Sequence, residues 1–271
     1  MSISEAFLEQ SAITWLSQIG YTHLDGAVIA PGEPHSERES FDDIFLRGRL
    51  RAAIARLNPQ LPPSTHDQIL RHITHHTAQT DNLMRINQHY HRLLRIGVPL
   101  ELRRSDGSVA GHMATIVDFD HPERNDWVVV SQLTVVNGRY QRRPDLVLYV
   151  NGIPLIVIEL KKPGDEYVSI DQAFQQLQTY KEQIPGLFYA NLGLIISDGI
   201  QAQVGSLSAS REWFKVWRTV DGQHEATRAQ LELEVLIHGM LTPTHLLALL
   251  RDFVAYESDA KGRLLKILAG Y

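Results

Sequence analysis

RPDLVLYVNGIPLIVIELKK, residues 143–162, predicts two β-strands joined by a tight turn. β-Branched and aliphatic side chains fill the stretch, interrupted once by Asn151-Gly152, a dipeptide typical of hairpin turns. Asp145 begins the first strand, while Glu159 lies near the end of the second with Lys161 two residues later. Because side chains alternate between the faces of a strand, Glu159 and Lys161 point the same way.

Two acids and an ammonium group on one sheet face indicate a site for a divalent metal and a phosphodiester. Mg²⁺ prefers oxygen ligands and usually takes one or two carboxylates, with water and substrate phosphate completing its octahedron. The metal makes bound water a better nucleophile and stabilises charge on phosphoryl oxygens. Lys161 would orient that water or neutralise the pentavalent phosphorus. The alternative for Asp145, Glu159 and Lys161 is a strand end with solvated charges.

The register of this hairpin decides whether such a site can form. With Asn151-Gly152 as a plain two-residue turn, Asp145 pairs with Ile158, so Asp145 and Glu159 lie on opposite faces. The site therefore requires an odd-numbered loop, such as residues 151–153, or a β-bulge. We expect one of these two irregularities.

The composition is that of a globular protein with one large domain or two small ones, with 44% hydrophobic and 21% charged residues among 271. No apolar run approaches the ~20 residues of a membrane span, and the acidic, amphipathic N-terminus is no signal peptide. The absence of cysteine excludes disulfides and thiolate metal ligands, and it fits a cytoplasmic location.

The charge is unevenly distributed. A net charge of −5 argues against a protein that simply coats DNA. Residues 45–104, however, contain ten arginines and only three acids. A basic face on an acidic protein suits a nucleic-acid partner bound from one side. Solvated helix faces explain the same charges equally well.

The periodicity of apolar residues predicts helices before residue 97 and mainly strands after it. The first helix carries an apolar stripe, starts with a capping box formed by Ser2 and Glu5, and ends at Gly20. Further helices are expected at residues 41–57, 65–77, 79–96, 169–183, 228–240 and after Thr242-Pro243. Strands are expected at residues 98–102, 111–119, 127–136, 145–150, 153–160, 192–197 and 201–207.

Several other residues have simple structural explanations. The histidines of HITHH (72, 75 and 76) and HYH (89 and 91) match no zinc spacing. Asp118 and Asp120, near a strand end, suit a β-turn better than a metal site. Trp213, Phe214 and Trp217 are expected in the core or at a sheet edge. The sequence contains no GxxxxGK[ST] loop for ATP and no GxSxG nucleophile.

Two helices offer residues that would complete the site. Gln176 and Tyr180 are four residues apart and share one face of the helix after the hairpin, either as an exposed rim or beside the acids. On the first helix, Glu5 and Glu9 compete as a third acid. Glu9 is preferred because Glu5 already belongs to the capping box.

The order of these motifs resembles that of the PD-(D/E)xK nucleases. More specifically, the chain is similar to the N-terminal part of the R (restriction, motor) subunit of type I restriction-modification enzymes. The similar stretches extend almost from end to end: GY (20–21), RLNPQLP (56–62), DFDHPERNDWVVVSQLTV (118–135), RPDLVLYVNGIPLIVIELKKP (143–163), QLQTYK (176–181) and IISDGIQAQVGSLSA (195–209).

The resemblance implies an α/β fold with a restriction-endonuclease-like mixed sheet flanked by helices and preceded by an N-terminal helical region. It implies a nuclease domain over residues 1–220, mainly helical over 1–96 with the sheet core over 97–220, and a helical connector over 221–271. Asp145, Glu159 and the Leu160 backbone carbonyl would bind Mg²⁺.

The resemblance also assigns roles to the remaining candidates. Lys161 would be the catalytic lysine, Gln176 and Tyr180 the accessory QxxxY pair, and Glu9 the helix-borne acid. The implied activity is metal-dependent cleavage of double-stranded DNA in the cytoplasm of a prokaryote, with methyltransferase and specificity subunits as partners. Subunits of this family continue into an ATP-driven motor, so ATP hydrolysis and translocation are expected of a further part of the protein. Two alternatives remain: a non-catalytic DNA-docking and assembly module, and a stand-alone repair nuclease of the same fold.

Overall fold

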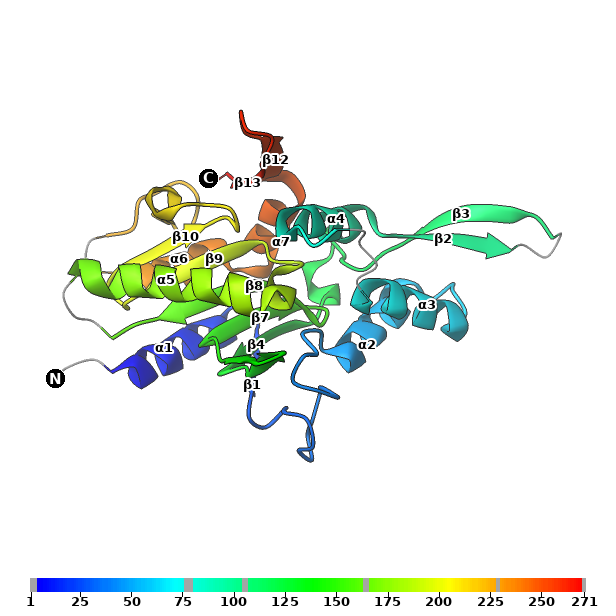
Figure 1. Cartoon of the computed structure of the whole chain (residues 1–271), viewed down its shortest axis with the longest axis horizontal. Helices are drawn as coiled ribbons and strands as arrows, with labels where there is room; N and C mark the ends of the chain where they lie inside the picture. Colours follow the sequence, from blue (N-terminus) through cyan, green and yellow to red (C-terminus); the bar gives the residue numbers. More distant parts are fainter. Residues whose placement is uncertain (1–3, 76–79, 104–106, 163–165, 228–229, 270–271) are drawn as a thin grey trace.

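A seven-stranded mixed sheet organises the part of the chain that the computed structural model describes, which is residues 4–75, 80–103, 107–162, 166–227 and 230–269. The strand order is β1-β4-β7-β8-β9-β10-β11 (Figure 1). The pairs β1/β4 and β8/β9 are parallel, and the other neighbours are antiparallel. The strands are β1 Thr22–Asp25, β4 Trp127–Ser131, β7 Leu146–Val150, β8 Ile153–Leu160, β9 Gly193–Ser197, β10 Ala202–Gly205 and β11 Lys215–Val216.

Helices and three small hairpins surround this sheet. The helices are α1 Glu5–Gln18, α2 Arg47–Leu57, α3 Pro63–Thr74, α4 Leu83–Ile96, α5 Glu166–Gln183, α6 Glu232–Met240 and α7 Pro243–Asp252, with 3₁₀ turns η1 Pro122–Arg124, η2 Pro185–Phe188 and η3 Arg211–Trp213. The hairpins pair β2 Val98–Arg103 with β3 Val109–Ala114, β5 Val135–Asn137 with β6 Tyr140–Arg142, and β12 Val254–Ser258 with β13 Leu264–Leu268.

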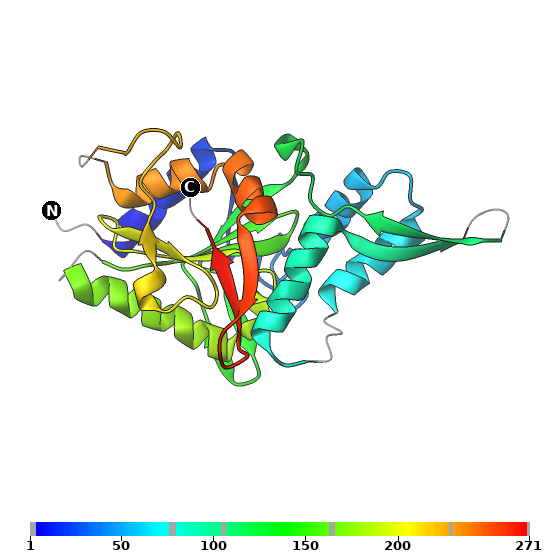
Figure 2. The same cartoon turned by 90° about the horizontal axis from the view of Figure 1, so that it is seen from above.

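The sheet is covered on both faces. Helices α1 and α6 pack together on one face, while α5 connects the parallel strands β8 and β9 across the other (Figure 2). Every residue of β4, β7, β8 and β9 is buried, as expected of strands that have helices on both sides. This arrangement confirms the expected α/β class with a mixed sheet flanked by helices.

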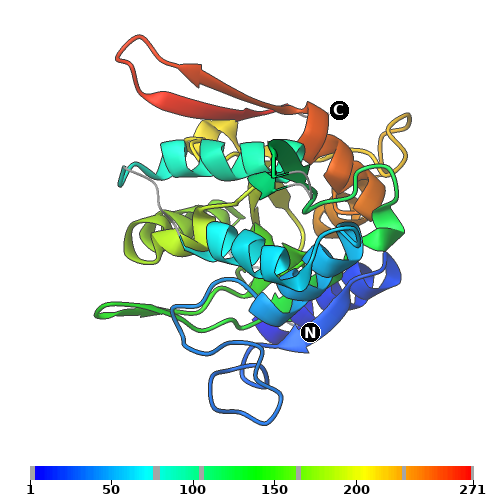
Figure 3. The same ribbon diagram turned by 90° about the vertical axis from the view of Figure 1, so that its right-hand side faces the viewer.

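The C-terminal hairpin and α4 form a separate feature at the edge of the molecule. Figure 3 shows the β12-β13 hairpin beside α4, and α4 contacts β13. The β2-β3 hairpin leaves the end of α4 and extends away from the main sheet (Figure 1). The expected helical connector over residues 221–271 is therefore wrong in part, because this segment contains α6 and α7 but ends in a β-hairpin.

Several predicted boundaries shift because side chains from elsewhere take the backbone hydrogen bonds. The helix expected over residues 41–57 begins only at Arg47. Before it, the buried Arg38 guanidinium donates to three backbone oxygens, including those of Phe41 and Asp43. The strand expected over residues 111–119 ends at Ala114, because the Asn58 amide binds both the N–H and the carbonyl of the next residue.

Other predictions fail for equally local reasons. The strand expected over residues 127–136 is interrupted at Gln132, whose φ of 52° is left-handed. Helix α4 begins at Leu83 with Asn82 as its cap, and residues 76–79 of the two expected helices lie outside the described residues. Helix α6 begins at Glu232, and residues 228–229 lie outside the described residues as well. Trp213 is 66% exposed, whereas Phe214 and Trp217 are buried as expected.

Among the described residues, no single helix has the length and composition needed to cross a membrane. Helices α6 and α7 pass that test only as a pair bent by 72°.

Candidate active site

The hairpin register brings the two strand-borne acids opposite each other. Val150 pairs with Ile153, so Asn151-Gly152 is a two-residue turn, with left-handed φ values of 52° and 77°. A β-bulge follows: Tyr149 pairs with Pro154 but Leu148 pairs with Ile156. In the resulting register Leu146 pairs with Ile158, and the next step places Asp145 opposite Glu159. The prediction of an odd loop or a bulge is confirmed, and the structure contains the bulge.

The turn at the hairpin tip is fixed by contacts with distant segments. The buried Asn151 amide donates to the Ile116 carbonyl (2.9 Å) and to the Asn125 side chain (2.8 Å), and its oxygen accepts from the Asp126 N–H. At Gly152 a Cβ atom would lie 2.5 Å from a backbone oxygen of the segment leading into α2. Asparagine and glycine are therefore required here by tertiary contacts as well as by the left-handed turn.

The strand ends form a compact polar cluster. The Leu160 N–H donates to Asp145 Oδ2 at 2.8 Å, which holds this carboxylate against the end of β8. Lys161 Nζ donates to Glu159 Oε1 at 2.6 Å and to the Leu160 carbonyl at 3.1 Å. Glu159 is fully buried, and its second oxygen, Oε2, has no hydrogen-bond partner among the described residues. The structure thus brings Asp145, Glu159, Leu160 and Lys161 together.

Burial controls the electrostatics of the acids. The pKa of Glu159 is raised to about 8, first by loss of hydration and then by the neighbouring Asp145 charge, and Lys161 offsets part of this rise. Burial also raises the pKa of Asp145, against the lowering effects of the Leu160 N–H and Lys161. Two acids that burial disfavours in their charged form, next to one ammonium group, are typical of a site that binds additional positive charge.

Glu9 reaches the cluster through a residue that the sequence did not single out. The Gln132 amide donates to Glu9 Oε2 and to Asp145 Oδ1, the latter at 3.2 Å. The Gln132 N–H also donates to the Asp145 carbonyl at 2.8 Å. Gln132 follows β4 directly and has a left-handed backbone, and a Cβ at the neighbouring Gly26 would lie 2.6 Å from its carbonyl oxygen. The available signal was that the polar pair Ser131-Gln132 interrupts an apolar run next to the strand that follows Asp145.

The capping-box explanation of Glu5 is wrong. Ser4 is the N-cap of α1 and accepts from the Phe7 N–H at 3.2 Å, whereas Ser2 lies outside the described residues. Glu5 instead accepts a hydrogen bond from the Lys162 N–H at 3.1 Å. Both glutamates of α1 therefore lie on the side of the helix that faces the cluster, and Glu9 is the one linked to Asp145.

Gln176 and Tyr180 line the cluster from α5. The Gln176 amide donates to the Tyr180 hydroxyl, and Tyr180 is only 2% exposed, so the pair is not an exposed helix rim. Burial, and then the adjacent charge of Glu159, raises the pKa of the Tyr180 phenol. The hydroxyl lies 3.5 Å from the Arg143 carbonyl at the start of the hairpin. The phenol is therefore protonated at neutral pH and positioned beside the two acids.

The remaining candidates lie apart from this cluster. Asp118 accepts from the N–H groups of Asp120 and His121, which is the predicted turn role. The described residues contain no group of three or more His, Cys, Asp or Glu side chains arranged to hold a metal ion, at the histidines of α3 and α4 or elsewhere. His76 lies outside the described residues.

This fold and this cluster define a class: a restriction-endonuclease-like α/β domain with an acid pair and a lysine at the end of a central hairpin. The sequence matches the family described as "Type I restriction enzyme R protein N terminus" over residues 2–213. The chain belongs to this family, which confirms the resemblance.

The similar proteins carry names that match this family. The type I restriction enzyme HindI endonuclease subunit of Haemophilus influenzae is 36% identical over 99% of this chain. The putative MjaIXP endonuclease subunit of Methanocaldococcus jannaschii is 30% identical over 97% of the chain. The SsaAORF53P endonuclease subunit of Staphylococcus saprophyticus is 34% identical over 41%. The chain spans about a quarter of the length of the first two relatives, at 26% of each.

Proposed function

We propose that this chain is the endonuclease domain of a type I restriction enzyme and that it hydrolyses phosphodiester bonds of double-stranded DNA at the Asp145–Glu159–Lys161 cluster. The observation that carries the proposal is the bulged register, which places the half-buried Asp145 and the fully buried Glu159 opposite each other on adjacent strands, with an ammonium group beside them. Names of the relatives support nuclease activity, since each is called an endonuclease subunit.

The cluster fits a divalent cation such as Mg²⁺. Its donors are all oxygens, which Mg²⁺ prefers: the carboxylates of Asp145 and Glu159 and the Leu160 carbonyl. The buried Glu159 Oε2 atom is without a partner in the part of the chain that the structure describes, and such an orphan acceptor is stabilised by a bound cation. Mg²⁺ commonly uses only one or two carboxylates, so no third acidic side chain is required. When bound there, the metal would supply Lewis-acid stabilisation of the phosphoryl oxygens and a more acidic water.

The protein groups around the donors have separate tasks. Lys161 holds Glu159 in place and brings a positive charge to the position where negative charge grows on phosphorus. The protonated Tyr180 hydroxyl, fixed by Gln176, can donate to water or to a DNA phosphate. Glu9 and Asp145 share the Gln132 amide, which holds the helix-borne acid at a fixed place relative to the strand-borne one.

The proposal extends to the rest of the enzyme. Because the chain spans about a quarter of its relatives, ATP-driven translocation would belong to another part of the protein. Methylation and site recognition would belong to methyltransferase and specificity subunits, and the assembly would act in the prokaryotic cytoplasm. The domain division at residue 220 also stands as a proposal.

Asp145→Ala and Lys161→Ala test the site in the full-length subunit within its assembled complex. We expect each to abolish DNA cleavage while ATP hydrolysis continues at the wild-type rate. Asp120→Ala and Lys162→Ala are matched controls, because Asp120 is an exposed turn residue and Lys162 follows the cluster with its side chain exposed. Calorimetric titration with Mn²⁺ should show binding to the wild type and none to Asp145→Ala. Unchanged cleavage by either cluster variant would falsify the assignment.

A further inference from the structure

The arginines of residues 45–104 differ between α2 and α4 in whether their charge is neutralised. On α2, Arg47, Arg49 and Arg51 pair with carboxylates, and Arg56 donates to the Arg124 carbonyl. On α4, Arg85, Arg92 and Arg95 are exposed, and none of the three guanidinium groups has a hydrogen-bond or ion-pair partner in the described part of the chain. Solvated, paired helix faces therefore explain the charge of α2, while α4 presents unneutralised positive charge.

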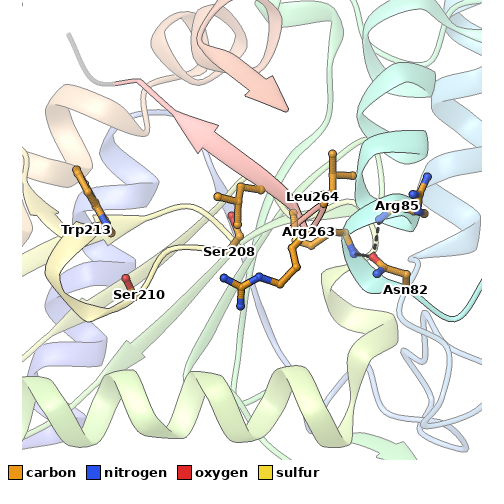
Figure 4. Close-up of a pocket in the computed structure, with 10 residues that line it drawn as sticks. Asn82, Arg85, Ser208, Ser210, Trp213, Arg263 and Leu264 are labelled. Carbon is orange, nitrogen blue, oxygen red and sulfur yellow. Dashed lines mark hydrogen bonds between the residues drawn. The ribbon is translucent and has the colours of Figure 1, made fainter. Parts of the chain in front are cut away.

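An open pocket of about 460 Å³ lies between this face of α4 and the C-terminal hairpin. Tyr256 of β12 forms its other side, and no Asp or Glu is among the described residues that line it. A second pocket of about 630 Å³ adjoins it at Arg85, where Arg263 of the hairpin and Asn82 also contribute (Figure 4). The two pockets together make an open, arginine-rich surface, the α4 groove, lined by residues Asn82, Arg85, His91, Arg92, Arg95, Tyr256 and Arg263. Of these arginines, Arg263 pairs with Asp259 at 2.7 Å.

His91 lines this groove with unused hydrogen-bonding capacity. Its side chain is only 7% exposed, and neither of its buried ring nitrogens has a hydrogen-bond partner within the described ranges. Its ring packs against Tyr256 at a centroid distance of 5.6 Å, and Lys266 lies near the same tyrosine ring. Burial, and then the charges of Lys266 and Arg95, lowers the pKa of His91 to about 3. At neutral pH the His91 ring is therefore uncharged, and the positive charge of the groove comes from its arginines.

We propose that the α4 groove binds the phosphate backbone of duplex DNA, with one phosphate held at the pocket by Arg92 and Arg95. Guanidinium groups bind phosphate oxygens in a two-pronged geometry, and backbone contacts of this kind supply most of the non-specific affinity for DNA. A free phosphate ion would contact only one pocket, whereas a DNA strand presents several phosphates in a line. The row from Arg85 to Arg95 spans ten helical residues, roughly 15 Å at about 1.5 Å each, so it matches a line of phosphates.

The proposal rests on the proposed function, and it places a DNA contact away from the cleavage cluster. Lys266 Nζ, beside the groove, donates to the Asn191 carbonyl just before β9. At the other end of β9, the Ser197 carbonyl accepts from the Lys161 N–H. The ends of this strand are separated by about 15–20 Å at about 3.3 Å per residue. The α4 groove and the cleavage cluster are therefore linked to opposite ends of one buried strand.

The test measures duplex binding under conditions where no cleavage takes place. Binding of a fluorescein-labelled 30-base-pair duplex is followed by anisotropy at several salt concentrations, with this chain carrying Asp145→Ala to prevent cleavage. We expect Arg92→Ala/Arg95→Ala to raise Kd at least about tenfold and to reduce the slope of log K against log salt by about 0.9 for each lost phosphate contact. Arg47→Ala/Arg51→Ala is the matched control, because it removes two paired arginines, and it should change neither quantity.

The His91 imidazole gives a second readout through its ¹⁵N resonances. Addition of the duplex should shift them, and the shift should be absent in Arg92→Ala/Arg95→Ala. A shift with inorganic phosphate and none with the duplex would identify a free-anion site and overturn the DNA assignment. Equal duplex affinity in the α4 and control variants would also overturn it, as would weakened assembly with the other subunits without any loss of DNA binding. If Asp145→Ala abolishes cleavage but the α4 variant binds the duplex normally, the groove proposal fails and the proposed function stands. The two proposals can therefore fail independently.

Discussion

Replacing Lys266 with methionine should stabilise the fold at neutral pH. Lys266 is 3% exposed, and burial lowers its pKa from 10.5 to about 7. At about 1.36 kcal/mol per pH unit, this shift corresponds to about 5 kcal/mol of cost for burying the ammonium group. The carbonyl of Asn191 that accepts from Lys266 also accepts from the Asn87 amide at 2.9 Å, so methionine leaves no backbone oxygen without a partner.

The net gain is smaller than this cost. Methionine forfeits the ammonium contact with the Tyr256 ring, whose centroid lies 5.9 Å away, and such contacts contribute about 0.5–2 kcal/mol. It also forfeits one charged hydrogen bond, of about 1.5–3 kcal/mol. We therefore expect Lys266→Met to raise the free energy of unfolding at pH 7 by roughly 1–3 kcal/mol, measured by urea denaturation with an unchanged m-value.

The sign of the pH dependence is a stricter test. Below pH 7 the lysine is protonated in both the folded and the unfolded chain, so the full cost is present. Between pH 7 and pH 10.5 the unfolded chain binds more protons at this lysine than the folded chain does, so the cost of burial disappears as the pH rises. Between pH 8 and 9.5 the wild type should therefore gain about 2 kcal/mol relative to Lys266→Met. Parallel pH profiles of the two proteins, or a lower urea midpoint for the variant at pH 7, would refute the reasoning.

Two further predictions concern the cluster and the turn that positions it. Gln132→Ala should lower the DNA cleavage rate roughly 10- to 100-fold, because hydrogen bonds to charged groups contribute about 1.5–3 kcal/mol and the variant leaves Asp145 without the bridging amide; full activity would show that the bridge has no role. Gly152→Ala should destabilise the fold by more than about 2 kcal/mol, since its Cβ would lie 2.5 Å from the Leu46 oxygen at a left-handed φ of 77°. Gly138→Ala, with a φ of 55° and open space, is its control and should cost about 1 kcal/mol in a urea titration; equal losses would show that the contact at the turn is harmless.

Local patterns predicted the strands and the acids of this protein because their causes are local. Alternation and β-branched residues define β7 and β8, and the dipeptide Asn151-Gly152 defines the turn between them. Counting residues across that hairpin also required an irregularity. The count could not choose between a longer loop and a bulge, because Asn151 is held by Ile116 and Asp126, which are distant in the sequence.

The missed features depend on contacts between segments far apart in the chain. Gln132 looked like one more residue of a long strand, and its left-handed backbone follows from its bonds to Asp145 and Glu9. The start of α2 shifted because Leu46 donates to the Gly152 carbonyl instead of lying within a helix. The C-terminal hairpin was missed because its strands are partly exposed and their apolar and polar residues do not alternate regularly, so neither helical nor strand periodicity is strong there.

The cost of burying Lys266 has a simple explanation if the α4 groove binds phosphate. The ammonium group lies beneath the groove, beside Tyr256, and its charge contributes to the low pKa of His91. In the free protein this positive charge has a backbone carbonyl but no carboxylate to neutralise it in the described part of the chain. A phosphate in the groove would offset part of that cost, so binding energy and stability are linked through the same residue. A buried lysine that destabilises the free fold is therefore expected where an anionic partner completes the site, and less expected in a groove that stays empty.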